Sequence, residues 1–275
     1  MLIWKNTSAL EGFEDGINFT EQKDFAEIAV IGSKPITIEE FPNLKGIFRA
    51  GISSDNVPIR EAQEHNILVC FPSNKTKDII YNETANFTCS FIFKMIHSNL
   101  GSINPWQKYS RNTLANKHLL VIGKGNIGKR VYDKMQHFMV VDSYDLIHNE
   151  IVELKEKVSN ANVVTIHIPI SEKNISFFGT NQLSWMQENS ILINTARANF
   201  VNEDALYIEL KSGRLRAAFD VFWTEPYQGK LMHLPENIFL KTPHVASNCV
   251  EFRYGCRVDL DKMTEKIKGN QTKTF

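Results

Sequence analysis

Residues 119–145, LLVIGKGNIGKRVYDKMQHFMVVDSYD, constrain the fold more than any other stretch of the chain. They begin with an unbroken apolar run, Leu119–Ile122, of the length and composition expected for a strand buried on both faces of a parallel sheet. Three glycines in the pattern G-x-G-x-x-G follow: Gly123, Gly125 and Gly128. Ile127, Val131 and Met135 then recur every fourth residue, as one buried stripe of a helix does. The stretch therefore predicts a strand, a tight glycine turn and a helix.

The spacing of the three glycines has a mechanical explanation. The first permits the tight turn out of the strand, the second lets the backbone approach a pyrophosphate, and the third lets helix and strand pack closely. The pyrophosphate would contact the free N–H groups at the start of the helix, around Asn126 and Ile127. A second apolar run, Phe138–Val141, ends close to Asp145, which is placed to bind a ribose diol; Asp142 is the alternative acid. The stretch predicts dinucleotide binding, and a tight turn without a ligand is the alternative.

The composition describes a globular protein of two domains without a preference for polyanions. At 275 residues the chain is long for one core, and 43% hydrophobic with 23% charged residues is ordinary. Its 31 basic and 31 acidic side chains balance, so we expect no nucleic-acid or membrane partner. The N-terminus, MLIWKNTSALEG, is too polar for a signal peptide, which predicts a cytoplasmic protein. The four cysteines form no C-x-x-C pair, so we expect isolated reduced thiols and no metal site.

Short apolar runs alternate with helical patterns along the chain, which implies parallel sheets. The predicted strands cover residues 25–31, 44–49, 67–71, 119–122, 138–141, 163–168, 191–194, 217–222 and 238–240. The further predicted helices cover residues 58–65, 77–100, 149–160, 182–186, 203–211 and 248–268. Asp55 or Asn56 would cap the helix at 58–65, and Gly213 would end the helix at 203–211. Phe91 and Met95 recur at helical spacing and are expected in the core rather than on an aromatic binding face.

Residues 101–117, GSINPWQKYSRNTLANK, interrupt this alternation with glycine, proline and polar residues. Such a segment marks a crossing between domains. We therefore expect residues 1–98 plus 248–275 to form one α/β domain and residues 99–247 to form the dinucleotide-binding domain.

Polar residues stand just after several of the predicted strands. Ligands bind beyond the carboxyl ends of the strands in an open parallel sheet, so these positions are candidates for a site. The candidates are His167, Pro169, Thr195, Ala196, Arg197, Asp220, Glu225 and His244. A histidine, an arginine and two acids are the groups that hydride transfer at a carbonyl carbon requires.

The chain resembles the D-isomer-specific 2-hydroxyacid dehydrogenases from about residue 43 to residue 268. The resemblance rests on separated motifs in the family's order: NLKGIFRAGISSDNV, VIGKGNIGK with SYD, VTIHIPIS, LINTAR, AAFDVFWTEP and LKTPHVAS. It implies two doubly wound parallel-sheet domains, a flavodoxin-like substrate domain and a Rossmann NAD-binding domain, with the active site in the cleft between them. It also implies a homodimer formed through the cofactor domain.

The resemblance assigns catalytic roles to three residues. His244 would be the general acid/base at the substrate oxygen, and Glu225 would pair with its imidazole and hold its orientation. Arg197 would bind the substrate carboxylate and polarise the reacting carbonyl. The plainer interpretations are a neutral histidine after a strand, an exposed turn acid and a surface ion pair. Asp220 would support the cofactor side of the site or, indirectly, the His–Glu pair, and a structural role is the alternative.

Further residues would bind substrate and cofactor. The backbone N–H groups of Gly51, Ile52 and Ser53 would bind the substrate carboxylate, and Arg49 beside this loop would assist with anionic substrates. The further cofactor contacts implied are Thr195, Ala196, His167 and Pro169, with a structural role as the alternative for the last two. No arginine closely follows Asp145 to receive a 2′-phosphate, so we predict NAD rather than NADP.

The chain departs from the family where Ala198-Asn199 and Ser53 replace glycines, and we expect these changes to alter substrate geometry rather than proton chemistry. The leading hypothesis is an NAD-dependent oxidoreductase acting on a small D-2-hydroxyacid or 2-oxoacid. The FRAG sequence resembles the 3-phosphoglycerate dehydrogenase branch, and lactate-, glycerate- and glyoxylate-type substrates are alternatives. A non-catalytic NAD(H)-sensing protein or corepressor is the alternative class, but it has no physical need for the catalytic set. A formate dehydrogenase-like enzyme is disfavoured because its histidine is not paired with a glutamate.

Overall fold

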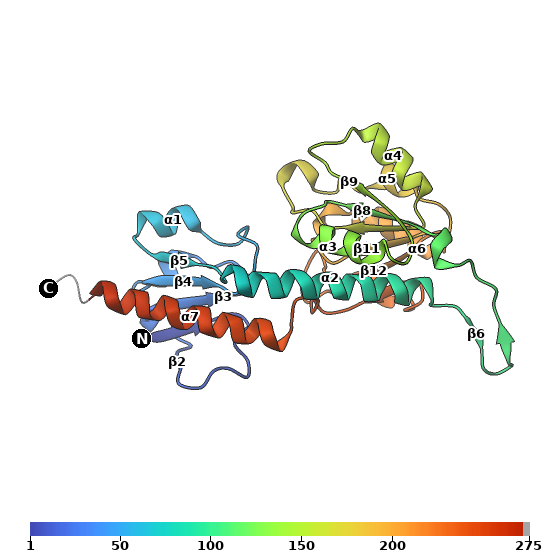
Figure 1. Cartoon of the computed structure of the whole chain (residues 1–275). Helices are drawn as coiled ribbons and strands as arrows, with labels where there is room; N and C mark the ends of the chain where they lie inside the picture. Colours follow the sequence, from blue (N-terminus) through green and yellow to red (C-terminus); the bar gives the residue numbers. More distant parts are fainter. Residues whose placement is uncertain (272–275) are drawn as a thin grey trace. The chain divides into compact units, whose positions relative to one another are not determined.

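The structure, a computed structural model, describes residues 1–271 and contains two compact units (Figure 1). One unit is Met1–Ile80 together with the chain from Asn248 onward, and the other is Tyr81–Ser247. The division between them falls within the long helix α2 (Asn74–Ile96). The domain boundary that the sequence places after residue 98 stays a prediction.

The first unit contains a five-stranded sheet in the order β2-β1-β3-β4-β5, parallel throughout. Its strands are β1 (Leu2–Lys5), β2 (Asn18–Phe19), β3 (Ile28–Ile31), β4 (Gly46–Arg49) and β5 (Leu68–Cys70). This is the flavodoxin-like order 2-1-3-4-5, so the predicted fold of this unit is confirmed. Strands β1 and β2 were not predicted, and β2 is only two residues long.

Helix α1 (Ile59–Glu64) lies where the sequence predicts a helix, but it has no side-chain cap. The predicted cap by Asp55 or Asn56 is wrong. The N-cap position is Pro58, whose side chain has no acceptor, and the Asn56 Oδ1 accepts instead from Arg49 Nε at 3.0 Å.

Helix α7 (Val250–Gln271) confirms the predicted C-terminal helix and lies along the sheet of the first unit (Figure 1). It packs on β4 at Gly46, where a Cβ atom would lie 2.2 Å from Met263 Cε and 2.8 Å from Ile267 Cδ1. Glycine at this position therefore lets the helix approach the strand. An apolar cluster that includes Ala29, Ile31 and Ile47 packs on the face of the sheet opposite α7.

The second unit contains a six-stranded parallel sheet in the order β13-β12-β11-β10-β8-β9. Its strands are β8 (His118–Ile122), β9 (Val140–Tyr144), β10 (Val163–Ile166), β11 (Ile191–Asn194), β12 (Arg216–Phe219) and β13 (Phe239–Lys241). Its other helices are α3 (Asn126–Met135), α4 (Ile151–Asn160), α5 (Thr180–Trp185) and α6 (Glu203–Lys211). The predicted Rossmann-type sheet is confirmed.

Strand β8 is apolar at consecutive positions because helices cover both faces of this sheet. Leu120 and Ile122 belong to a core with α4, α5 and α6, whereas Leu119 and Val121 belong to a core with α2 and α3. The second core includes Val131 and Met135 of the predicted α3 stripe and Phe91 and Met95 of α2, all at most 4% exposed. The prediction that these side chains are core is confirmed.

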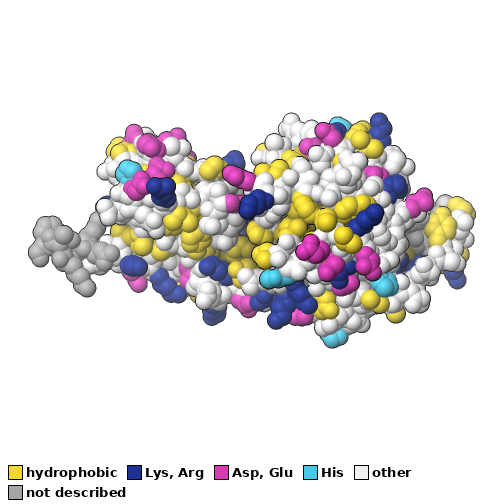
Figure 2. Space-filling view, turned by 90° about the horizontal axis from the view of Figure 1, so that it is seen from above, with side chains coloured by type: hydrophobic (Ala, Val, Ile, Leu, Met, Phe, Trp, Pro, Cys, Tyr) yellow, Lys and Arg dark blue, Asp and Glu magenta, His cyan; other side chains and the backbone are white. Residues whose placement is uncertain are grey.

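A short hairpin, β6 (Gly101–Ser102) with β7 (Gln107–Lys108), follows α2 and was not predicted as strands. Its turn exposes large apolar side chains, with Ile103 79% and Trp106 74% exposed (Figure 2). Within residues 1–271, no helix combines the length and the apolar character that crossing a bilayer requires.

Candidate active site

The polar residues that the sequence places after strands lie at the carboxyl edge of the second unit's sheet. Arg197 follows β11, Asp220 and Glu225 follow β12, and His244 follows β13. Because β11, β12 and β13 are adjacent and parallel, their carboxyl ends share one edge. The sheet order therefore gathers residues that are far apart in the chain.

His244 and Glu225 form a hydrogen-bonded pair. The imidazole Nδ1 lies 2.9 Å from Glu225 Oε2 and 3.1 Å from Oε1. A carboxylate only accepts, so Nδ1 carries the proton and Nε2 is the nitrogen that can exchange a proton with a substrate. The N–H of Phe222 donates to Glu225 Oε1 at 3.1 Å and fixes the other side of the carboxylate.

Charge around Glu225 favours its ionised form. Partial burial alone would raise the pKa of Glu225, but the His244 hydrogen bond and charge, the Phe222 N–H and the positive Arg197 together hold this pKa below its usual value. The structure thus brings Arg197, Glu225 and His244 into one electrostatic group. An oriented imidazole, a carboxylate and a guanidinium can bind an anionic substrate and move one proton.

Asp220 holds the turn that presents His244. Its buried carboxylate accepts hydrogen bonds from Thr242 Oγ1 at 2.5 Å, Val245 N at 2.8 Å and Ala246 N at 2.9 Å. Burial raises the pKa of Asp220 against these hydrogen bonds. His244 itself has φ 54°, a left-handed conformation that costs a non-glycine residue energy and needs external support. The contacts support the predicted link to the His–Glu pair, while a cofactor contact of Asp220 stays a prediction.

Arg197 is positioned by the loop after β11. Asn194 closes this loop, since its Oδ1 accepts from Ala196 N and its Nδ2 donates to Arg197 O, each at 3.0 Å. The Arg197 Nη1 donates to Ala196 O at 2.8 Å. Ala198 and Asn199 begin a 3₁₀ turn, and neither is among the left-handed non-glycine residues of the described chain. Replacing the family's glycine here therefore creates no backbone strain.

The glycine turn matches the geometry predicted for a pyrophosphate site. Gly123 has φ 89°, and a Cβ there would lie 2.4 Å from Ile168 Cγ2. A Cβ on Gly128 would lie 1.9 Å from the carbonyl oxygen of Gly123, so the helix approaches the strand as closely as glycine allows. Gly125, the N-cap of α3, faces open space instead. The space at Gly125 and the first N–H groups of a ten-residue helix fit a dinucleotide pyrophosphate.

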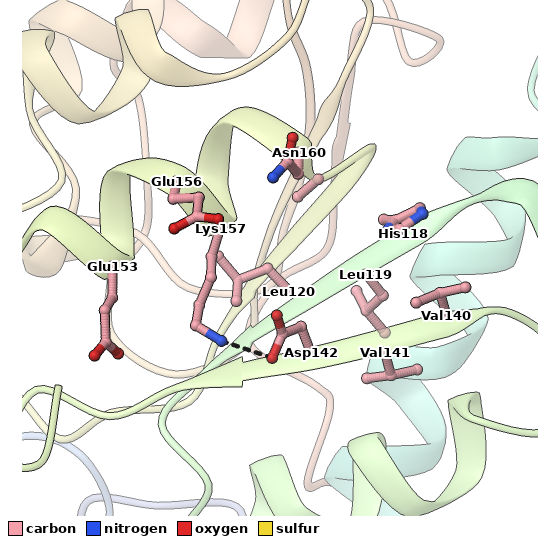
Figure 3. Close-up of a pocket in the computed structure, with 11 residues that line it drawn as sticks. His118, Leu119, Leu120, Val140, Val141, Asp142, Glu153, Glu156, Lys157 and Asn160 are labelled. Carbon is pink, nitrogen blue, oxygen red and sulfur yellow. Dashed lines mark hydrogen bonds and ion pairs between the residues drawn. The ribbon is translucent and has the colours of Figure 1, made fainter.

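The two candidate ribose acids occupy different places. Asp145 directly follows β9, at the carboxyl edge, and its Oδ1 accepts from Ile147 N at 3.0 Å. Asp142 lies within β9 and pairs with Lys157 at 2.8 Å, as Figure 3 shows. A pocket of about 460 Å³ surrounds this pair and is lined by residues at the starts of β8 and β9, including His118. The pocket therefore lies at the amino edge of the sheet, away from the glycine turn.

His167 and Pro169 lie in the loop after β10, and His167 lies against the glycine turn. His167 Nε2 is 3.0 Å from Thr165 Oγ1, and desolvation lowers the pKa of His167 to about 3, so the imidazole is neutral. Pro169 O accepts from Asn174 Nδ2 at 2.9 Å. These contacts explain how the loop is held, and the predicted role toward adenosine stays a prediction for both residues.

Thr195 anchors the loop before Arg197 to helix α2. The Thr88 hydroxyl donates to Thr84 O at 2.8 Å, so the Thr195 hydroxyl, 2.8 Å from Thr88 Oγ1, acts as the donor of that pair. Thr195 is 7% exposed. Its hydroxyl is thus engaged within the protein, and the cofactor contacts predicted for Thr195 and Ala196 stay predictions.

In the first unit, Arg49 shapes the loop predicted to bind the substrate carboxylate. Its guanidinium is buried and donates to Ser53 O, Asn56 Oδ1 and Ala50 O at 3.0 to 3.1 Å. A Cβ on Gly51 would lie 2.3 Å from Arg49 Nη1, so the absence of a side chain at this position leaves room for the guanidinium. Ser53 has no left-handed backbone, so the serine that replaces a glycine here is unstrained.

Sequence reasoning missed the residues that hold the catalytic candidates in place. Asn194 and Thr242 lie inside the motifs LINTAR and LKTPHVAS, but neither was given a role. The Phe222 N–H is a backbone donor and carries no sequence signal at all. A buried polar residue at a strand end, such as Asn194, is the signal that could have been used. Within residues 1–271, no group of three His, Cys, Asp or Glu side chains is arranged to hold a metal ion.

The chain was compared with known proteins. Residues 95–246 match the family described as D-isomer specific 2-hydroxyacid dehydrogenase, NAD binding domain. A D-3-phosphoglycerate dehydrogenase of Methanocaldococcus jannaschii is 30% identical over 246 residues, which cover 84% of this chain and 47% of that protein. A hydroxypyruvate reductase of Thermotoga maritima is 29% identical over 245 residues, covering 84% of this chain and 78% of that protein.

Solved structures share the fold. The TT0316 protein of Thermus thermophilus superposes with a TM-score of 0.80 at 20% identity, covering 98% of this chain and 97% of that one. A D-lactate dehydrogenase of Aquifex aeolicus, solved with NAD and lactic acid, has a TM-score of 0.79 at 20% identity and covers 100% and 97% of the two chains. The family match also confirms NAD as the cofactor expected from the glycine motif. The chain belongs to the D-isomer-specific 2-hydroxyacid dehydrogenase family.

Proposed function

We propose that this protein is an NAD-dependent oxidoreductase that interconverts a small D-2-hydroxyacid and the corresponding 2-oxoacid. The observation that carries the proposal is the His244–Glu225 pair, with both carboxylate oxygens within 3.1 Å of the imidazole Nδ1. It stands at the carboxyl edge of the same sheet whose β8 leads into the glycine turn. A protein that only binds NAD has no need for such an oriented acid–base group.

His244 moves the proton of the reaction. In the reductive direction, protonated His244 donates its Nε2 proton to the ketone oxygen, which becomes the hydroxyl group of the product, and the imidazole is left neutral. In the oxidative direction, the neutral Nε2 takes that proton back. Glu225 accepts from Nδ1 throughout and keeps Nε2 directed at the substrate. The nicotinamide cofactor, when bound, would supply or accept the hydride at the carbon that carries this oxygen.

Arg197 provides the positive charge for the substrate. A guanidinium offers two parallel N–H donors that match a carboxylate, and it polarises a neighbouring carbonyl. In the first unit, the backbone N–H groups of Ile52 and Ser53 are proposed to bind a substrate carboxylate, whereas the N–H of Gly51 donates to Arg49 O at 2.9 Å. Arg49 keeps that loop in shape through its contacts with Ser53 O and Ala50 O.

The substrate is proposed to be a two- or three-carbon 2-oxoacid, and a 3-phosphoglycerate-like molecule is included because the FRAG sequence resembles the 3-phosphoglycerate dehydrogenase branch. The names of the relatives span this range, from phosphoglycerate dehydrogenases to hydroxypyruvate and glyoxylate reductases. The alternative function, a corepressor that senses NAD(H) on the same fold, predicts cofactor binding without turnover.

The test is oxidation of NADH against a panel of 2-oxoacids that includes glyoxylate, pyruvate, hydroxypyruvate and its 3-phosphate. We expect turnover with at least one of them, and His244→Ala should lower kcat by about a hundredfold or more while NADH still binds. His233→Ala, which removes an exposed histidine of the same unit, is the matched control and should keep wild-type kcat. NADH binding with no turnover across the panel would favour the sensor, and undiminished turnover of His244→Ala would remove His244 from the mechanism.

A further inference from the structure

The segment between β12 and the 3₁₀ turn Lys230–His233 carries Glu225 on a loop that is itself partly exposed. The Glu225 side chain is 34% exposed, so packing alone does not fix its carboxylate. Besides the His244 imidazole, the Phe222 N–H donates to that carboxylate at 3.1 Å. The orientation of Glu225 therefore depends in part on where the loop holds Phe222.

Tyr227 holds Phe222 in place from the other side of the loop. The two rings are stacked, with centroids 4.7 Å apart and planes inclined by 21°. The chain also wraps around the tyrosine ring, because a Cβ on Gly229 would lie 2.4 to 2.5 Å from its atoms. The loop is thus folded over Tyr227, and the residue that donates to Glu225 lies against the ring.

The hydroxyl of Tyr227 connects this loop to helix α6. It donates to Glu203 Oε1 at 2.7 Å and accepts from Leu231 N at 3.2 Å. Glu203 is the first residue of α6, and the N-cap Asn202 holds that turn by accepting from Ala205 N at 2.9 Å. The stacking of rings needs no hydroxyl, so a phenylalanine would pack equally well. What the tyrosine adds is a tie from the Glu225 loop to a capped helix end.

We infer that Tyr227 is a positioning residue for the acid–base pair: its hydrogen bond to Glu203 keeps Phe222 N–H on the Glu225 carboxylate, and thereby keeps Glu225 on His244. The inference rests on the proposed function, because it concerns the same pair. It goes beyond that function by assigning a role to residues that do not touch the substrate or the cofactor. Burial and the hydrogen bond to Glu203 raise the pKa of Tyr227. The phenol therefore stays protonated and acts as a donor.

The test is a set of three variants of the full chain: Tyr227→Phe, Glu203→Ala and Glu203→Gln. Tyr227→Phe removes the hydroxyl but leaves the ring, and Glu203→Ala removes the acceptor. Glu203→Gln keeps an oxygen that can accept from the phenol, so it serves as the conservative rescue. Tyr207→Phe is the matched control, because it removes a different tyrosine hydroxyl, which lies on α6.

The direct readout is the carboxyl ¹³C NMR titration of Glu225, assigned with Glu225→Gln and recorded without substrate or cofactor. Loss of the Phe222 N–H should raise the pKa of Glu225 in Tyr227→Phe and in Glu203→Ala. The same two variants should lower kcat by about threefold to tenfold and shift the acid limb of the pH profile upward, while the Kd for NADH is unchanged. Glu203→Gln and Tyr207→Phe should behave as the wild type. Combining Tyr227→Phe with Glu203→Ala should add nothing to either, because both break one interaction.

A Glu225 titration unchanged in both Tyr227→Phe and Glu203→Ala, with the variants folded, would overturn the inference. Additive effects in the double variant would do the same. If Tyr227→Phe does not fold, Glu203→Ala and Glu203→Gln still decide the question, since Glu203 is only partly buried. Because the titration needs no turnover, its result stands apart from the substrate panel, and either proposal can fail alone.

Discussion

The side chains of His244 and Glu225 are each 34% exposed. At that exposure water screens much of their attraction, so the pair contributes little to stability. Its main consequence is geometric, because a carboxylate on Nδ1 selects one tautomer of the imidazole. The left-handed backbone of His244 and the three hydrogen bonds to Asp220 also fix the position of the imidazole.

The lowered pKa of Glu225 predicts a pH-dependent stability. The folded pKa lies below the usual value of 4.5, so the interaction is fully present above about pH 4.5 and is lost as the pH falls through the folded pKa. Thermal unfolding of the wild type and Glu225→Gln between pH 3 and 7 should show a difference in Tm that shrinks on acidification. A difference that is the same at every pH would contradict the assigned interaction.

Asp145 should decide between the two nicotinamide cofactors. A carboxylate at the ribose repels a 2′-phosphate, so we expect NADH to bind at least about tenfold more tightly than NADPH. Asp145→Asn removes the charge and should narrow that ratio. Asp142→Asn is the control, because Asp142 pairs with Lys157 at the other edge of the sheet, and it should leave the ratio unchanged. Fluorescence titration measures both affinities, and tighter NADPH binding by the wild type would sink the assignment.

At the scale of elements, the strand, glycine turn and helix from β8 to α3 could be predicted in detail. Their signals are local: an apolar run, a left-handed turn at Gly123 and a helical stripe ending at Met135. The sheet of the first unit was predicted less completely, because β1 and β2 were missed and the two-residue β2 is too short to show a period. The failed cap prediction at Asn56 has a different cause, since helix α1 starts after Pro58 and the Asn56 Oδ1 accepts from Arg49 Nε.

The glycine turn yields a prediction that separates packing from ligand binding. Gly128→Ala places a Cβ 1.9 Å from Gly123 O, so it should cost roughly 1–3 kcal/mol of stability, lower Tm by several degrees and weaken NADH binding. Gly125→Ala meets open space and should leave Tm within about 1 °C, yet still weaken NADH binding by obstructing the pyrophosphate. Differential scanning fluorimetry and NADH titration measure the two effects. Unchanged NADH affinity in Gly125→Ala would argue against a pyrophosphate at this turn.

At the scale of the whole molecule, the exposed apolar hairpin points to self-association. The family resemblance implies a homodimer through the cofactor domain, and the β6–β7 turn carries Ile103 and Trp106 with most of their surface exposed. Large apolar side chains that are exposed close together on a surface commonly mark a protein interaction site. We therefore expect the hairpin to contribute to the contact between two copies of the chain.

Light scattering should give a mass of twice the 31.5 kDa of one chain. The double variant Ile103→Glu, Trp106→Glu should give the monomer mass, because two buried charges would oppose the contact. Ile147→Glu is the control, since Ile147 is 84% exposed on a different loop of the same unit, and this variant should keep the dimer mass. A monomer mass for the wild type at micromolar concentration would contradict the predicted dimer.

The sequence by itself determined the fold class, the glycine turn, the cofactor and the identity of the candidate catalytic residues. These follow from rules that act over a few neighbouring residues, such as the period of apolar side chains and the freedom of glycine. Only the tertiary structure decided which groups hold the candidates in place. Asp220 meets Ala246 across 26 residues, and Tyr227 meets Glu203 across 24. Such contacts depend on the order of the strands in the sheet, because that order determines which strand ends become neighbours at its carboxyl edge.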